Sequence, residues 1–307
     1  MKTGLSVENE IHRMLDQYVP EENLHRLIQT FIEDKKNENS AWAGLTRCVH
    51  YMLGGTSPAI ERAAAITELF ILLLDIVDDL QDRDQPDKPW MKSDSAVTLN
   101  ALLALSAAVI GEIGRLVPGS LAAEVGALLA CSVHGQQTDI AGDVRTEEDY
   151  LEMVERKSGS LLQFACLMGY SLVDGVTEQT RNALNELACC AGIVAQIEND
   201  MNDVLRFDLK NDLLQKKRTL PILYVLEDAA EECPELAGYY DGNLNLEDIL
   251  PRKMDILAYI RDSGCLEYCR VIQTLYVDKA RELYRTLPAK EPWGDRFMEQ
   301  AFPQGFD

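Results

Sequence analysis

The stretch that decides the fold class runs from an apolar segment into a cluster of acids: Leu69-Phe70-Ile71-Leu72-Leu73-Leu74-Asp75-Ile76-Val77-Asp78-Asp79-Leu80-Gln81-Asp82-Arg83-Asp84. Four aspartates stand at positions i, i+3, i+4 and i+7, so a helix presents them on one face. Acids at this spacing repel one another and do not stabilise the helix. The apolar turns before them predict a helix in the middle of a bundle, with the acids at the mouth of its core. Such a face suits magnesium bridging to phosphate oxygens. The alternative is a solvated acidic helix end.

Helical spacing of apolar residues continues outward from this stretch over nearly the whole chain. The spacing predicts helices over 8–33, 40–54, 59–82, 95–115, 120–141, 147–174, 178–208, 219–232, 246–262 and 266–286. Stretches 59–77 and 99–110 are apolar on most faces and are expected inside the bundle. No strand-like alternation, repeat or linker interrupts the pattern. The sequence therefore predicts an all-α protein, a single large helical bundle forming one domain over residues 1–307.

A second polar cluster follows another apolar helical run, Leu187 to Val194. It consists of Asn199, Asp200 and Asp203, with Gln196 one turn before Asp200. Basic residues follow downstream, at Lys210, Lys216, Lys217 and Arg218. In so acidic a chain they suit a diphosphate clamp, although a solvated loop explains them equally well. Gln136 and Asp139, one turn apart, are interpreted from the residues alone as a buried structural pair.

The composition excludes several classes of function. The net charge of −22 repels phosphate backbones, which argues against nucleic-acid binding. The eight cysteines have no paired CxxC spacing, so no zinc site is indicated. With no signal peptide evident, we expect reduced cysteines and a cytoplasmic protein. The apolar run Leu69–Val77 is far shorter than the ~20 residues of a membrane span, and loose attachment to a membrane surface stays open.

Five elements in order resemble the trans-isoprenyl diphosphate synthases. Asp78-Asp79-Leu80-Gln81-Asp82 matches their DDxxD motif, and Gly192–Asp203 is similar to their GxxxQxxDDxxD motif with Asn199 at the first aspartate. The remaining elements are Gly135-Gln136-Gln137-Thr138-Asp139-Ile140, Lys157-Ser158 and the segment from Asp212 to Pro221. The resemblance implies a helical bundle whose two aspartate-rich helices face each other across a cavity, often as a homodimer, with three Mg²⁺ ions at each site.

Two departures from that family narrow the function. The basic GGKRxRP element that binds isopentenyl diphosphate should fall near residues 37–43, where the sequence has no Lys or Arg. The RRG after the first motif is also missing. The combination resembles one branch of the superfamily, the ComQ-type prenyltransferases of Bacillus, which modify the ComX quorum-sensing pheromone in competence regulation. Binding of an acceptor that carries a second diphosphate would be unfavourable, because this acidic chain offers few cations to pair with it.

This resemblance implies a role for each site residue. The metal ligands would be Asp78, Asp79, Asp82, Asn199, Asp200 and Asp203. Lys157, Lys210 and Lys217 would bind the diphosphate of geranyl or farnesyl diphosphate, and Ser158 and Gln196, with Lys157, would serve catalysis. Phe70, Leu73 and Leu74 would line the prenyl pocket; Phe70 lies ~12 Å before Asp78 by helix rise, and an ordinary core position is its alternative.

The acceptor expected from the ComQ-type resemblance is a tryptophan of a small peptide pheromone precursor. Two alternatives stay open: a chain-elongating geranyl or farnesyl diphosphate synthase that uses isopentenyl diphosphate, and a non-catalytic partner subunit of such a synthase. A terpene cyclase does not fit, because Asp203 and Phe207 stand where those enzymes have Ser or Thr and Glu.

Overall fold

Helices are the regular elements of the computed structural model, which describes residues 6–38, 41–116, 119, 121–206 and 212–303, and no strand occurs among them. The all-α prediction is confirmed. The α-helices are α1 Val7–Tyr18, α2 Glu22–Lys36, α3 Trp42–Met52, α4 Ile60–Asp82, α5 Pro89–Lys92, α6 Ser95–Leu116, α7 Leu121–Ala141, α8 Glu147–Val154, α9 Ser160–Tyr170, α10 Glu178–Val204, α11 Leu220–Glu232, α12 Pro234–Tyr240, α13 Leu246–Ile249, α14 Lys253–Asp262, α15 Cys265–Thr286 and α16 Trp293–Ala301. A π-helical turn, η1, spans Glu155–Gly159, and a 3-10 turn, η2, spans Leu250–Arg252.

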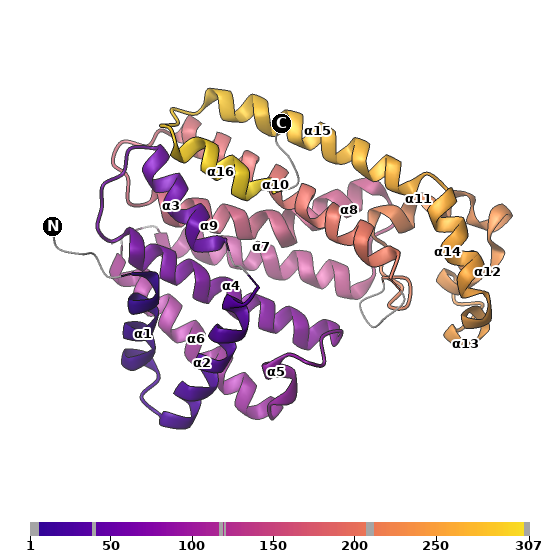
Figure 1. The fold of residues 1–307 in the computed structure, drawn as a ribbon, viewed down its shortest axis with the longest axis horizontal. Coiled ribbons are helices and arrows are strands. Elements are labelled where there is room, and N and C mark those ends of the chain that lie inside the picture. Colours follow the sequence, from indigo (N-terminus) through magenta and orange to yellow (C-terminus); the bar gives the residue numbers. More distant parts are fainter. Residues whose placement is uncertain (1–5, 39–40, 117–118, 120, 207–211, 304–307) are drawn as a thin grey trace.

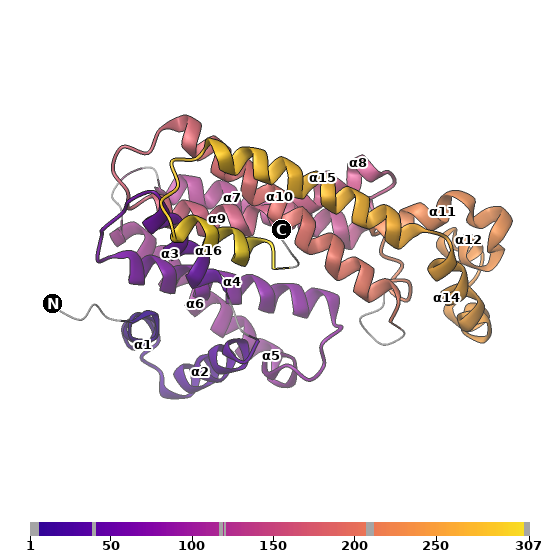
Figure 2. The same ribbon diagram turned by 45° about the horizontal axis from the view of Figure 1, so that its top comes forward.

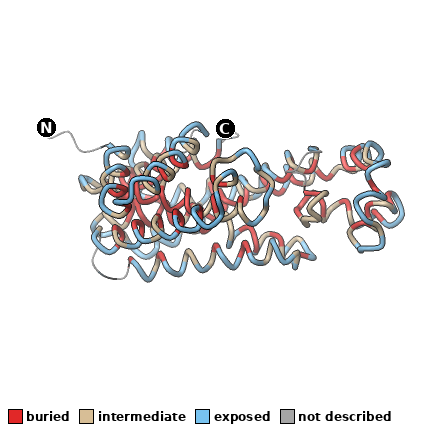
Figure 3. Tube along the Cα trace, turned by 90° about the horizontal axis from the view of Figure 1, so that it is seen from below, coloured by how far each residue is buried: buried red, intermediate tan, exposed pale blue. Residues whose placement is uncertain are grey.

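The bundle is organised around α4, α9 and α10. Helix α4 contacts α3, α6 and α9, and α10 packs on α9 and along α15. Figures 1 and 2 show α15 running beside α10 from the main body to a projecting end formed by α11–α14. The main core is continuous through the body, whereas the projecting end buries a smaller core of its own. Figure 3 shows the same division, with most buried residues inside the body.

Glycines bring three backbones close together beside the π-turn η1. A Cβ atom at Gly192 of α10 would lie 2.6 Å from the Gly159 nitrogen, and one at Gly135 of α7 would collide with the backbone of Lys157. Only glycine permits this approach. A π-turn inside a helical run re-aims the side chains that follow it. The close packing therefore fixes Lys157 and Ser158 between α7 and α10.

Several helix boundaries differ from the predicted ones. The predicted helix 8–33 is two helices, because the chain turns at Val19-Pro20 and Glu21 caps the second with its side chain. The predicted helix 147–174 is interrupted by η1, and the predicted helix 246–262 by η2 at Pro251. Helices α5, α12 and α16 were missed because each is short.

Helix α6 departs from the expectation of a helix inside the bundle. Its residues Leu99, Leu103 and Ile110 are 56%, 68% and 68% exposed. Within the described residues it is the one helix whose length and composition would allow it to cross a membrane, and 44% of that window is buried. The sequence prediction was wrong here because a helix that is apolar on most faces does not reveal which face is covered.

Candidate active site

The acids of α4 and α10 face one polar cavity of about 450 Å³. Asp78, Asp79 and Asp82 approach it from α4, and Asn199, Asp200 and Asp203 approach it from α10. Asp139 and Asp212 also line it, so Asp139 is part of the cavity wall rather than of a structural pair alone. Its predicted partner Gln136 lines a neighbouring cavity and donates its amide N–H to Asp82 Oδ1 at 3.4 Å. The described lining holds eight carboxylates against three cations. An anionic ligand therefore needs added positive charge to enter.

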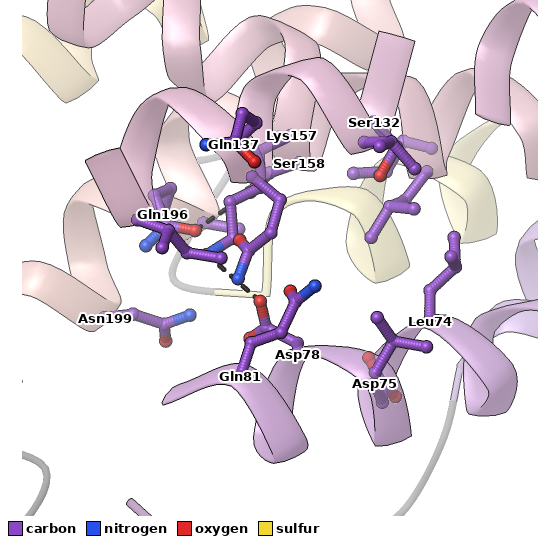
Figure 4. Close-up of a pocket in the computed structure, with 18 of the residues that line it drawn as sticks. Leu74, Asp75, Asp78, Gln81, Ser132, Gln137, Lys157, Ser158, Gln196 and Asn199 are labelled. Carbon is purple, nitrogen blue, oxygen red and sulfur yellow. Dashed lines mark hydrogen bonds and ion pairs between the residues drawn. The ribbon is translucent and has the colours of Figure 1, made fainter. Parts of the chain in front are cut away.

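A second, more apolar cavity of about 340 Å³ adjoins the first and shares four of its residues: Asp78, Lys157, Gln196 and Asn199. Figure 4 shows these four side chains pointing toward one another between the helices. Leucine, valine and isoleucine side chains line the wall behind them. A ligand with a charged head and an apolar tail would fit across the two cavities, with its junction at the four shared residues.

Two lysines pair with the acids of α4. Lys157 Nζ lies 2.8 Å from Asp139 Oδ2 and 3.3 Å from Asp78 Oδ1. Lys217 Nζ lies 2.6 Å from Asp82 Oδ2. Burial alone would lower the pKa of Lys157, but Asp139 and Asp78 outweigh it and raise that pKa. Both lysines therefore stay charged at the cavity wall. Lys210 lies outside the described residues.

A chain of hydrogen bonds orients the α10 side of the cavity. Ser158 Oγ donates to Gln196 Oε1 at 2.9 Å, and Gln196 Nε2 donates to Asp200 Oδ1 at 2.8 Å. Tyr150, fully buried on α8, donates its hydroxyl to Asp200 Oδ2 at 2.6 Å. Burial raises the pKa of Asp200 to about 6 despite these donors. Tyr150 was not predicted as a site residue, because a lone tyrosine in a helix gives no signal for a partner 50 residues away.

Asp79 differs from the other α4 acids in its contacts. Its carboxylate accepts hydrogen bonds from Trp90 Nε1 at 2.8 Å and from Gln85 Nε2 at 2.6 Å. Burial raises the pKa of Asp79 to about 6, against the effect of both donors. Asp79 thus ties α4 to α5 as well as lining the cavity, and Asp78, whose side chain is 39% exposed, keeps the most open position of the three.

The three predicted prenyl-pocket residues occupy different environments. Leu74 lines the apolar cavity, while Leu73 and Phe70 belong to the buried core and are absent from the cavity lining. Phe70 stacks on Phe164 of α9, with ring centroids 4.0 Å apart. The pair lies in the core beneath the cavity and is not part of the wall that the described residues form.

The polar cavity suits magnesium held jointly with a phosphate ligand. Among the described residues no three His, Cys, Asp or Glu side chains are grouped closely enough to hold a metal alone. Mg²⁺ commonly takes one or two carboxylates and completes its shell with water and substrate phosphates. Burial raises the pKa of Asp78, and Gln136 Oε1 is buried without a hydrogen-bond partner. A bound cation would favour the ionised form of Asp78, and a polar ligand at the adjoining apolar cavity would give Gln136 Oε1 a donor.

The pattern of the polyprenyl synthetase family matches residues 45–250, which contain both acidic helices and the lysines between them. The chain belongs to the polyprenyl synthetase family. It is a prenyltransferase with the all-α fold of isoprenyl diphosphate synthases.

This polyprenyl synthetase family member resembles the tryptophan prenyltransferase ComQ in particular. It is 29% identical over 302 residues to ComQ of Bacillus subtilis subsp. natto, covering 97% of this chain and 92% of the relative. It is 30% identical over 271 residues to ComQ of Bacillus subtilis strain 168, covering 87% and 88%. Geranylgeranyl pyrophosphate synthase from Lactobacillus brevis shares the fold, with a TM-score of 0.78 at 18% identity over 97% of this chain and 96% of that one. The predicted resemblance to ComQ-type enzymes is confirmed.

Proposed function

We propose that this prenyltransferase transfers a geranyl or farnesyl group from its diphosphate to a tryptophan side chain of a small peptide pheromone precursor. The observation that carries the proposal is the pair of adjoining cavities, one acidic and one apolar, that share Asp78, Lys157, Gln196 and Asn199. The relatives that match the chain over most of its length are named tryptophan prenyltransferases, which supports the acceptor. A role in quorum sensing and competence follows from the same likeness.

The residues that would hold Mg²⁺ are Asp78, Asp82 and Asp79 on one side and Asn199, Asp200 and Asp203 on the other. Three ions would share these six side chains and the diphosphate oxygens. Bound there, Mg²⁺ would stabilise the charge of the departing diphosphate. Asn199 would contribute its amide oxygen, and it adds no charge.

The remaining residues bind, orient and exclude water. Lys157 reaches the cavity from η1 and Lys217 from the segment before α11, and with Lys210 they would neutralise phosphate charge. The Ser158–Gln196 hydrogen bond holds both side-chain oxygens at the junction of the cavities, where an allylic carbon would carry positive charge. The apolar wall, including Leu74, would hold the prenyl tail and keep water from the reacting carbon.

A homodimer is the proposed assembly, and the exposed stripe on α6 supports it. Leu99, Leu103 and Ile110 lie on one face of the helix, and Val133 and Ile140 are exposed on α7. Apolar patches of this kind are commonly covered by a partner. Sedimentation of Leu103→Asp protein tests the dimer, and vesicle binding tests the alternative of attachment to a membrane surface.

All eight cysteines are free, and seven are buried, which supports a reducing cytoplasmic location.

The function is tested by supplying the purified protein with Mg²⁺, geranyl or farnesyl diphosphate and short tryptophan-containing peptides. A peptide mass gain of one geranyl or farnesyl unit is expected. A chain-elongating synthase would instead lengthen dimethylallyl diphosphate with isopentenyl diphosphate. A non-catalytic subunit would release no pyrophosphate from either allylic substrate, and that result would refute the proposal.

A further inference from the structure

A network of lysines and carboxylates borders the apolar cavity one turn before Asp78. Lys35 of α2 places Nζ 2.8 Å from Asp75 Oδ2 and 2.7 Å from Glu38 Oε2. Lys88, just before α5, places Nζ 2.8 Å from Asp34 Oδ2 and also pairs with Glu38. These five residues are called the lip network. Asp75 connects the network to the cavity, because it lines the cavity wall near Leu74 and Asp78 (Figure 4).

The lysines of the lip network are already neutralised. Three carboxylates surround two ammonium groups, which leaves the network with a net charge of −1, and each lysine contacts two carboxylates. Burial alone would lower the pKa of Lys35, but Asp75 and Glu38 raise it. Residues 37–43 contain no Lys or Arg, and Lys35 and Lys88, which flank this stretch, are already paired with carboxylates. A second diphosphate at the lip would have to break these ion pairs.

The cavity wall beside the lip offers contacts for an uncharged aromatic group. Trp42 at the start of α3 lines the same cavity as Asp75. An indole side chain packs well against another aromatic ring. Lys35 Nζ pairs with Asp75 through its Oδ2 atom. An ionised carboxylate has about four acceptor positions, so Asp75 can also accept an N–H group.

We propose that the lip network selects the acceptor: it excludes an acceptor that carries a diphosphate and admits an uncharged aromatic N–H donor between Trp42 and Asp75. The inference rests on the proposed function and deepens it. In this proposal Asp34, Glu38 and Asp75 select the class of acceptor. The missing basic element alone would explain only why binding of a second diphosphate is lost. Neutralising Asp34 and Glu38 removes both carboxylate partners of Lys88, whereas Lys35 keeps Asp75, so Lys88 should become free to pair with an anion at the cavity mouth.

The experiment compares Asp34→Asn/Glu38→Gln with Glu8→Gln/Glu22→Gln. Both variants remove two negative charges from the α1–α2 region, but Glu8 and Glu22 pair with Lys36 and Arg26 outside the lip. Binding of isopentenyl diphosphate in Mg²⁺ is measured by calorimetry, which requires no turnover. The lip variant should bind it at least about tenfold more tightly than the wild type, the effect of one charge-assisted hydrogen bond. The control variant should stay within about twofold of the wild type, because its charges are exposed.

Equal changes in the two variants, or no change in either, would overturn the inference. Thermal unfolding shows whether the lip variant folds. If it does not, comparing Glu38→Gln with Glu8→Gln provides the same test, since Glu38 is partly exposed.

A second measurement follows transfer of a farnesyl group to N-acetyltryptophan amide. Isopentenyl diphosphate should inhibit this transfer in the lip variant more strongly than in the control, and equal inhibition contradicts the inference. If no variant releases pyrophosphate from farnesyl diphosphate, the proposed function is refuted. The calorimetric measurement of isopentenyl diphosphate binding would still test whether the lip network excludes a diphosphate.

Discussion

Lys217 Nζ lies 2.6 Å from Asp82 Oδ2, although 135 residues separate the two in sequence. The pair joins the end of α4 to the segment before α11. Lys157 makes a parallel connection from η1 to Asp78 at 3.3 Å. Each lysine thus contacts a carboxylate of α4 and also lines the cavity, where it could contact a bound anion. With a metal and a diphosphate bound, these carboxylates would hold the metal and the lysines would pair with the phosphate.

Replacement of Asp82 by asparagine should reduce pyrophosphate release from farnesyl diphosphate by about 100-fold or more. The amide removes one charge that would hold the metal, and losses of this size follow removal of one electrostatic contact to a transition state. The protein should still fold, because Lys217 remains near the charge of Asp139. The rate of pyrophosphate release and the melting temperature are the measurements. Asp87→Asn, at an exposed carboxylate in the following loop, is the control and should keep the wild-type rate. A near-normal rate in Asp82→Asn would remove this residue from the metal site.

Magnesium and pyrophosphate together should stabilise the protein more than the sum of their separate effects. The described residues contain no group of three acidic ligands, so Mg²⁺ alone is held by few protein oxygens. Pyrophosphate alone meets eight carboxylates and is repelled. Joint binding at about 100 times Kd stabilises the folded state by about 2.7 kcal/mol. Melting temperatures with each ligand and with both test this, and EDTA should abolish the joint shift. A full shift with Mg²⁺ alone would contradict the shared site.

The two acidic helices could be predicted from the sequence because their spacing is local. Asp78 and Asp82 are four residues apart, and helix geometry places them on one face. The face-to-face arrangement with Asn199 and Asp203 came only from the family resemblance, since nothing in the spacing brings residues 120 positions apart together. The cavity lined by all four agrees with that expectation.

The contacts that arise from packing could not be predicted. Tyr150 reaches Asp200, and Lys35 and Lys88 meet at Glu38, through tertiary contacts that leave no periodic trace in the sequence. The exposed face of α6 was missed for a different reason: apolar residues lie on most faces of the helix, so the pattern does not show which face is buried. Prediction failed where a side chain's partner is set by the fold rather than by its neighbours along the chain.

Replacement of Phe70 by alanine should shift the preferred allylic substrate toward a longer chain. Phe70 stacks on Phe164 in the core beneath the apolar cavity, and removing its ring opens space there. The variant should lose about 3–5 kcal/mol of stability. Phe297→Ala, a fully buried ring on α16, should cost similar stability without changing substrate preference. The rates with farnesyl and geranylgeranyl diphosphate are the measurement. An unchanged ratio in Phe70→Ala would mean that Phe70 serves the core alone.

Buried His50 should make the protein less stable as the pH falls below 6.5. Its Nε2 accepts a hydrogen bond from the Ser57 backbone N–H at 3.1 Å, and its Nδ1–H donates to Gly169 O at 3.2 Å, so the ring is held neutral. Burial lowers the pKa of His50 below its usual value of 6.5. The unfolded chain therefore takes up a proton at a higher pH than the folded protein does. Stability is full above pH 6.5 and declines below it, by up to about 1.4 kcal/mol per pH unit.

Denaturant unfolding at pH 7.5, 6.5 and 5.5 measures this dependence of stability on pH. His50→Gln cannot take up the proton, so its stability should change less between pH 6.5 and 5.5 than that of the wild type, even though its stability at pH 7.5 is lower. His134→Gln, at an exposed position of α7, should keep the wild-type slope. If His50→Gln and the wild type lose the same free energy over this interval, another group is responsible for the acid sensitivity. A smaller slope in His50→Gln alone would show that the turn after α3, which His50 holds through Ser57, depends on a neutral imidazole.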